Sequence, residues 1–157
     1  VRPKPEYGTI EVRSFDMPLQ VEKAVALAVF VRRCAGLALN DILQAPEHPL
    51  FNLDQCNRFL ACRDGIEAEL INPFTGQMAS MKSWFLSVLE QIRTAGLSDR
   101  ESTWLTWLEH EVLQHDQAQW MRKLWHETGG DGQKNLHDYC SKISAVLLQR
   151  SAMLAGA

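Results

Sequence analysis

The stretch that decides the fold lies at the start of the chain, where residues 2–16 read RPKPEYGTIEVRSFD. Pro3 and Pro5 predict an extended approach, because a proline pushes the residue before it out of the helical region. Residues 7–15 then alternate between apolar and polar side chains, with Ile10 between two polar neighbours. A period of two is typical of a strand. We therefore predict one strand at the N-terminal end.

The sequence that follows is helical by its hydrophobic period. The predicted helices cover residues 21–43, 53–63, 82–94, 99–114, 117–127 and 133–153. Between the second and third of these helices, the sequence Asn72-Pro73-Phe74-Thr75-Gly76 is rich in turn-forming residues and predicts a small hairpin of residues 66–71 and 77–81. The predicted fold class is α+β, helix-rich, with one N-terminal strand and a small hairpin.

Composition and charge limit the partners and the compartment. The 157 residues carry 16 basic and 19 acidic side chains, a net charge of -3, and this lacks the basic excess that nucleic-acid binding usually requires. The longest apolar run, residues 24–31, is far shorter than the roughly 20 residues that span a bilayer. The four cysteines form no close pair. We expect no nucleic-acid or membrane partner, a cytoplasmic location, and cysteines that pack as small apolar side chains.

The predicted N-terminal strand raises a question of pairing. A lone strand cannot satisfy its backbone hydrogen-bonding groups, and one strand with a single hairpin is close to the smallest sheet that is stable alone. We therefore expect this strand to pair with chain outside the 157 residues. Because the sequence also begins at Val1 rather than Met, we interpret it as the C-terminal part of a larger protein or as one piece of a nicked protein.

One face of the predicted strand carries groups with chemical potential. Thr9, Glu11 and Arg13 occupy successive same-side positions, roughly 6.5 to 7 Å apart. A carboxylate is a ligand that Mg²⁺ prefers, and a guanidinium suits a phosphate. The alternative is an antiparallel strand with one solvated face, on which these residues are ordinary cross-strand partners.

The sequence also resembles a known family. Three blocks carry the resemblance: Arg2-Pro3-x-Pro5 with Gly8-Thr9-Ile10-Glu11-Val12-Arg13 and Asp16-x-Pro18-Leu19; Asn57-Arg58-Phe59-x-Ala61-Cys62-Arg63-x-Gly65 with Asn72-Pro73-x-Thr75-Gly76; and, more loosely, Ala118-Gln119-x-Met121-Arg122 with Gly129-Gly130. They are similar to segments of the carboxylate-amine ligases, also called type 2 glutamate-cysteine ligases. The resemblance runs from Val1 to about Tyr139.

The resemblance implies a fold and a reaction. Residues 1–157 would form a single C-terminal portion of a glutamine-synthetase-like domain, with residues 1–81 near the site and residues 82–157 as a helical buttress. Members of the family use ATP and Mg²⁺ to phosphorylate a carboxylate, and an amine then attacks the acyl phosphate to form an amide. The usual substrates are an amino acid, glutamate, and an amine, cysteine. The missing N-terminal half of the ligase would be the partner of this chain, and the formation of a homo-oligomer stays open.

Specific residues acquire roles from the same resemblance. Glu11 is implied as the metal ligand and Arg13 as the catalytic residue that binds the transferring phosphate. The candidates for contacts with ATP or substrate are Arg2, Thr9, Arg13, Asn57, Arg58 and Arg63. On a regular helix Phe59 and Arg63 share one face and Arg58 lies on another. A structural ion pair with Asp54 is the alternative for Arg58.

Two further alternatives come from the helical part. Five tryptophans lie at helical spacings: Trp84, Trp104, Trp107, Trp120 and Trp125. Large aromatic residues at this period are more often part of a core or an interface than a binding platform. The alternative function is that of a non-catalytic helical interaction module derived from the ligase fold.

Overall fold

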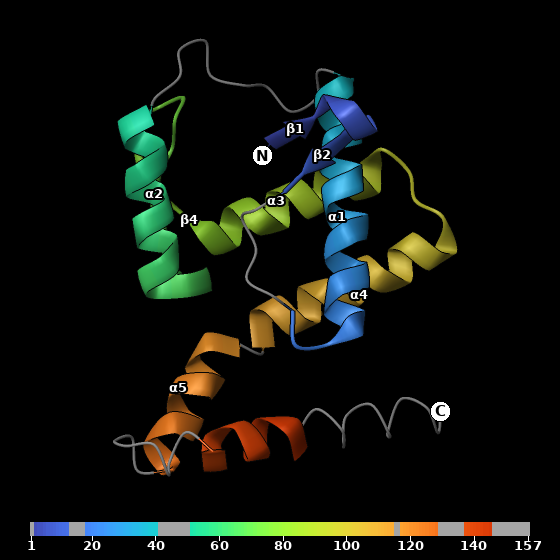
Figure 1. The fold of residues 1–157 in the computed structure, drawn as a ribbon. Helices are drawn as coiled ribbons and strands as arrows, with labels where there is room; N and C mark the ends of the chain where they lie inside the picture. The colour runs from blue at the N-terminus through green and yellow to red at the C-terminus, as the bar shows by residue number, and fades with distance from the viewer. Residues whose placement is uncertain (1, 13–17, 41–50, 115–116, 129–136, 146–157) are drawn as a thin grey trace.

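The computed structural model describes residues 2–12, 18–40, 51–114, 117–128 and 137–145. Its elements in chain order are β1 (Arg2–Lys4), the 3₁₀ turn η1 (Pro5–Tyr7), β2 (Thr9–Glu11), α1 (Val21–Leu39), α2 (Phe51–Asp64), the 3₁₀ turn η2 (Gly65–Glu67), β3 (Glu69–Ile71), β4 (Met78–Ser80), α3 (Met81–Thr94), α4 (Asp99–Gln114) and α5 (Gln117–Glu127). Residues 137–145 are also helical. Helices dominate, and the strands form two short antiparallel pairs (Figure 1). The predicted helix-rich α+β class is confirmed.

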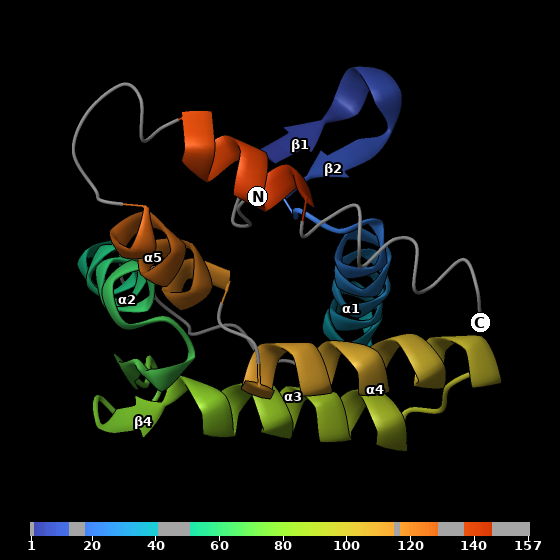
Figure 2. The same cartoon turned by 90° about the horizontal axis from the view of Figure 1, so that it is seen from below.

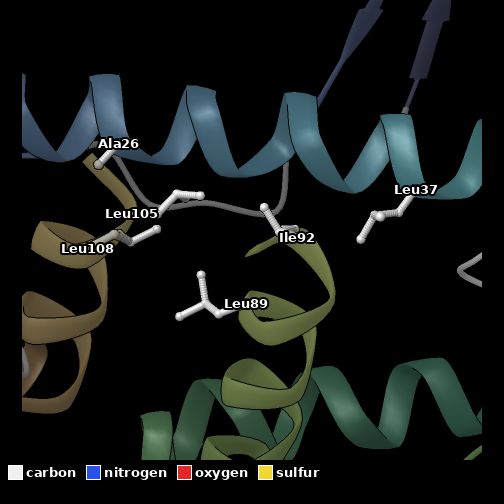
Figure 3. Close-up of a cluster of buried hydrophobic side chains, with 6 residues drawn as sticks. All are labelled: Ala26, Leu37, Leu89, Ile92, Leu105 and Leu108. Carbon is white, nitrogen blue, oxygen red and sulfur yellow. The ribbon is translucent and has the colours of Figure 1, made fainter. Parts of the chain in front are cut away.

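Three helices build the main hydrophobic core. Helices α3 and α4 lie side by side, and α1 packs across both of them (Figures 1 and 2). The buried side chains at their centre are Ala26 and Leu37 of α1, Leu89 and Ile92 of α3, and Leu105 and Leu108 of α4 (Figure 3). Ala26 and Leu37 are eleven residues apart, about three helical turns, and the pairs on α3 and α4 are each three residues apart, so each pair lies on one face of its helix.

Aromatic side chains surround this core. The rings of Phe30 and Phe85 lie 5.8 Å apart and join α1 to α3. The rings of Trp104 and Trp107 meet edge to face at 6.5 Å, and both residues pack against the buried cluster. The interpretation of tryptophans as core residues is therefore confirmed for this pair.

The predicted helices agree closely with the observed ones. The largest difference among the described residues is in α2, which begins at Phe51 instead of residue 53. The last three residues predicted for the first helix, 41–43, lie outside the described residues, as do the ends of the last predicted helix.

The predicted hairpin is formed by β3 and β4 and is the second hairpin along the chain. It is confirmed, with shorter strands than predicted. Leu70 lies opposite Ala79, and Asn72 closes the turn by accepting hydrogen bonds from the backbone N–H groups of Phe74 and Thr75 at 2.8 and 3.2 Å. Gly76 has a φ of 71°, in the left-handed region that glycine adopts without strain.

The prediction that the first strand has no local partner is wrong. Residues Thr9–Glu11 pair with Arg2–Lys4, so the N-terminal segment is itself a hairpin. Pro5 begins the 3₁₀ turn between the strands, and Gly8 ends it with a φ of 60°. The sequence pattern suggested an extended approach because both prolines exclude helix, and it concealed the reversal between them.

The cysteines differ from expectation in part. All four are free thiols. Cys34 is half-buried and packs against the core, and burial raises its pKa. Cys56, Cys62 and Cys140 are exposed, so the interpretation of these three as packed apolar side chains is wrong. Among the described residues, no helix has the length and apolar character needed to cross a membrane.

Candidate functional site

The first hairpin carries the block expected to hold metal and phosphate. Its register places Arg2 opposite Glu11 and Lys4 opposite Thr9. The turn is closed by the backbone N–H of Gly8, which donates to the carbonyl of Pro5 at 3.2 Å. Thr9 and Glu11, two residues apart on one strand, therefore share a face as predicted.

The two faces of β2 differ from the expected pattern of exposure. Glu11 is half-buried, whereas Thr9 is exposed. Ile10, expected on the apolar side of the strand, is 66% exposed. The predicted face of the strand comprises Thr9, Glu11 and Arg13. Arg13 lies outside the described residues, so the structure places Thr9 and Glu11 of this face.

Asn57, in the second block, holds helix α2 against the second hairpin. Its side-chain amide donates to the carbonyl of Ile71 at 2.9 Å, and its side-chain carbonyl accepts from the N–H of Ile71 at 2.8 Å. This reciprocal pair mimics a strand partner for β3. The geometry therefore gives Asn57 a positioning role within the block.

The two arginines of α2 each have an acidic partner. Arg58 donates to Asp54 at 2.8 Å, which is the structural ion pair considered as the alternative. Arg63 donates to both carboxylate oxygens of Asp64, at 2.8 and 2.7 Å, and its guanidinium lies 5.7 Å from the centre of the Phe59 ring. The predicted shared face of Phe59 and Arg63 is confirmed. The hydrogen bonds from Arg63 lower the pKa of Asp64.

The structure does not bring the two blocks together. Figures 1 and 2 show α2 and the hairpin of β1 and β2 apart from each other. Within the described residues, no group of three or more His, Cys, Asp or Glu side chains is placed to hold a metal ion. A metal ion held by Glu11 would therefore need ligands from beyond the described residues.

The most strongly organised polar cluster was not predicted. Glu101 of α4 is 7% exposed and accepts hydrogen bonds from Arg32 and Arg33 of α1. It also accepts from the N–H and hydroxyl of Ser98, at 3.0 and 2.8 Å, while the Ser98 hydroxyl accepts from the N–H of Glu101 at 3.4 Å. The spacing Ser98-x-x-Glu101 is a capping box, a signal that the sequence contains. The partnership with α1 has no comparable local signal.

This cluster perturbs the titration of Glu101. The hydrogen bond from Arg33, followed by those from Ser98 and Arg32, holds the pKa of the Glu101 carboxyl far below its usual range. A carboxylate so placed stays ionised at neutral pH and is not suited to act as a general base. We assign the cluster to the joining of α1 and α4.

The comparison with known proteins identifies the family. In chain order the structure presents a hairpin, a block of helix and turn, and a helical remainder. The family described as glutamate-cysteine ligase family 2 matches residues 1–139. The chain belongs to this family.

Individual relatives agree with the family match. A protein of Herminiimonas arsenicoxydans named "Putative glutamate--cysteine ligase 2" is 33% identical over 147 residues, which cover 93% of this chain and 38% of the relative. Proteins of the same name from Janthinobacterium sp. (strain Marseille) and Acidovorax sp. (strain JS42) are 34% and 35% identical, over 96% and 81% of this chain and 40% and 34% of theirs. The chain thus spans between one third and two fifths of the length of these relatives.

Proposed function

We propose that the protein containing this chain is a cytoplasmic ligase that joins glutamate to cysteine, or to a similar amine, with ATP and Mg²⁺. The observation that carries the proposal is the family match over residues 1–139, which includes both site blocks. In this reaction a carboxylate oxygen attacks the terminal phosphorus of ATP and ADP leaves. The amine nitrogen then attacks the acyl carbon, and an amide forms with release of phosphate.

Glu11 fits the role of a magnesium ligand by its chemistry. Mg²⁺ prefers oxygen ligands and is commonly held by one or two carboxylates together with substrate phosphates and water. When bound, the ion would supply positive charge that neutralises the phosphates of ATP. Glu11 is half-buried and lies in β2, which is paired with β1. This pairing fixes the backbone position from which its carboxylate extends. The remaining ligands would come from the rest of the protein.

The arginines divide into two groups under this proposal. Arg13 would grip the transferring phosphate with its planar fork, and Arg2, opposite Glu11 in the hairpin register, belongs to the same segment. Arg58 and Arg63 are exposed and already neutralised by Asp54 and Asp64. A substrate phosphate or carboxylate would have to compete with these partners, so we rank the hairpin residues first.

The decisive experiment measures phosphate release by the full-length protein with Mg²⁺, ATP, glutamate and cysteine. Glu11→Gln should lower the rate at least tenfold, because it removes one charge from the metal environment at almost constant volume. Glu6→Gln is the matched control: Glu6 is exposed in the neighbouring 3₁₀ turn, pairs with Lys4 at 3.6 Å, and should leave the rate unchanged.

Two results would contradict the proposal. Unchanged turnover and Mg²⁺ dependence in Glu11→Gln would remove this residue from the site. A folded full-length protein that releases no phosphate with any amino acid and amine would favour the non-catalytic interaction module. Because the remaining metal ligands would come from the rest of the protein, we also expect no amide formation by residues 1–157 alone.

A further inference from the structure

A hollow lies between the C-terminal half of α1 and the end of α3. It has a volume of about 390 Å³ and is lined by Arg32, Arg33, Gly36, Leu37, Asn40, Ile92 and Ala95. Leu37 and Ile92 are 4% and 1% exposed, so they form an apolar floor. Figure 3 shows both side chains in the space between α1 and α3. The size is within the range of small-molecule sites.

The polar side of the hollow has an excess of positive charge. Arg32 and Arg33 share a single carboxylate, that of Glu101, so two positive charges meet one negative charge. Arg93 of α3, the neighbour of Ile92 in sequence, is already paired with Glu109 at 2.5 Å. In addition, the Nε of Arg33 is enclosed and has no hydrogen-bond acceptor among the described residues. The positive charge that Glu101 leaves unbalanced favours an anionic group in the hollow.

The carbonyl ends of α1 and α3 border the same hollow and carry partial negative charge. Capping groups reduce that charge. The backbone N–H and the side-chain amide of Asn40 both donate to the carbonyl of Gly36, at 3.2 and 2.9 Å. The backbone N–H of Ala95 donates to the backbone carbonyl of Gln91 at 3.0 Å. The full charges of the guanidinium groups therefore dominate.

Gly36 keeps the hollow open. Glycine within a helix costs stability relative to alanine, and it usually serves a positive φ or a close approach of another segment. Gly36 has neither reason: it lies inside α1, and a Cβ built on it would meet nothing within 4 Å among the described residues. The space that it leaves belongs to the hollow itself.

We propose that this hollow binds a small molecule that has an anionic group on a short apolar body. The anionic group would pair with the guanidinium of Arg33, with Arg32 at the rim, and the apolar body would rest on Leu37 and Ile92. The site is distinct from the hairpin that carries Glu11, and it does not depend on the proposed ligase activity.

The test uses calorimetric titration of the full-length protein with a set of probes that share one body. 3-Methylbutanoate and 3-methylbutyl phosphate carry the two anionic groups, and 3-methylbutylamine carries the opposite charge. We expect saturable binding of at least one anionic probe and none of the amine. The comparison of carboxylate and phosphate identifies the preferred group. Equal binding of the amine, or no saturable binding of either anion up to tens of millimolar, would overturn the proposal.

Variants place the binding in the hollow. Gly36→Leu fills the space without changing charge and raises helix propensity, so it should abolish binding while the protein stays folded. Arg33→Gln should weaken binding at least tenfold. Arg58→Gln, an exposed arginine on α2, and Glu11→Gln are the controls and should bind as wild type. Undiminished binding in Gly36→Leu would refute the site even if Arg33→Gln fails to fold.

Discussion

Asn57 offers the sharpest test of how the second block is built. Its side chain makes two hydrogen bonds with the backbone of Ile71, and both residues are half-buried. A typical hydrogen bond contributes about 0.5 to 1.5 kcal/mol net. Asn57→Ala removes both, so we expect the link between α2 and β3 to weaken by about 1 to 3 kcal/mol. The loss should be local, because α2 is outside the three-helix core.

The assay is amide hydrogen exchange at Ile71, whose N–H donates to Asn57. A loss of about 1 to 3 kcal/mol corresponds to exchange that is roughly 5- to 150-fold faster if exchange follows local opening. Asn52→Ala is the control, since it makes the same substitution at an exposed position of the same helix. It should leave Ile71 protected.

Asn57→Asp separates the two hydrogen bonds. Aspartate keeps an oxygen that can accept from the N–H of Ile71, but it loses the donor to the carbonyl and places negative charge beside it. Ile71 should therefore stay better protected in Asn57→Asp than in Asn57→Ala, while the helix still loosens. Exchange at Ile71 that is unchanged in Asn57→Ala would refute the positioning role and return Asn57 to the candidates for ligand contact.

Three further predictions concern the site, the core and the ion cluster. Arg13→Lys should lower turnover of the full-length protein more than twofold, because lysine cannot make a bidentate contact with phosphate; a smaller change would support the solvated strand. Leu105→Ala should destabilise the fold by about 2 to 5 kcal/mol, measured by urea denaturation, because Leu105 is fully buried; Thr106→Ala, at an exposed position, should have little effect. Glu101 has a lowered pKa in the folded state, so its contribution to stability is present above its unfolded pKa and is lost as the pH falls through the folded value. The difference in denaturation midpoint between wild type and Glu101→Gln should therefore be larger at pH 7 than at pH 3, and a constant difference would contradict this.

Local signals predicted most elements of the fold. The period of 3.6 located the helices, and the turn at Asn72 located the second hairpin, because these signals depend on neighbouring residues. The first hairpin shows where a local signal misleads. Pro3 and Pro5 each favour an extended residue before them, but Pro5 and Gly8 also reverse the chain, so that Arg2–Lys4 pairs with β2.

Only those contacts of the candidate site that join residues close in sequence could be predicted. The ion pair of Arg58 with Asp54 and the shared face of Phe59 and Arg63 follow from helical spacing. The hydrogen bonds between Asn57 and Ile71 join α2 to β3 across 14 residues, and no local pattern in the sequence predicts which residues of the two elements meet. The pairing of Arg33 with Glu101 joins residues 68 positions apart, and a single sequence has no periodicity that predicts such a contact.

The parts of the chain that carry the family blocks differ physically from the part that forms the core. The buried cluster comes from α1, α3 and α4, whereas the hairpin segment exposes Tyr7 and Ile10 at 75% and 66%. A two-stranded hairpin is marginal in water by itself, so apolar side chains exposed on it gain stability only by packing against something else. The relatives are more than twice as long as the matched region, and we expect the additional chain to supply that packing. Substitutions at Glu11 should accordingly change chemistry without unfolding the helical core.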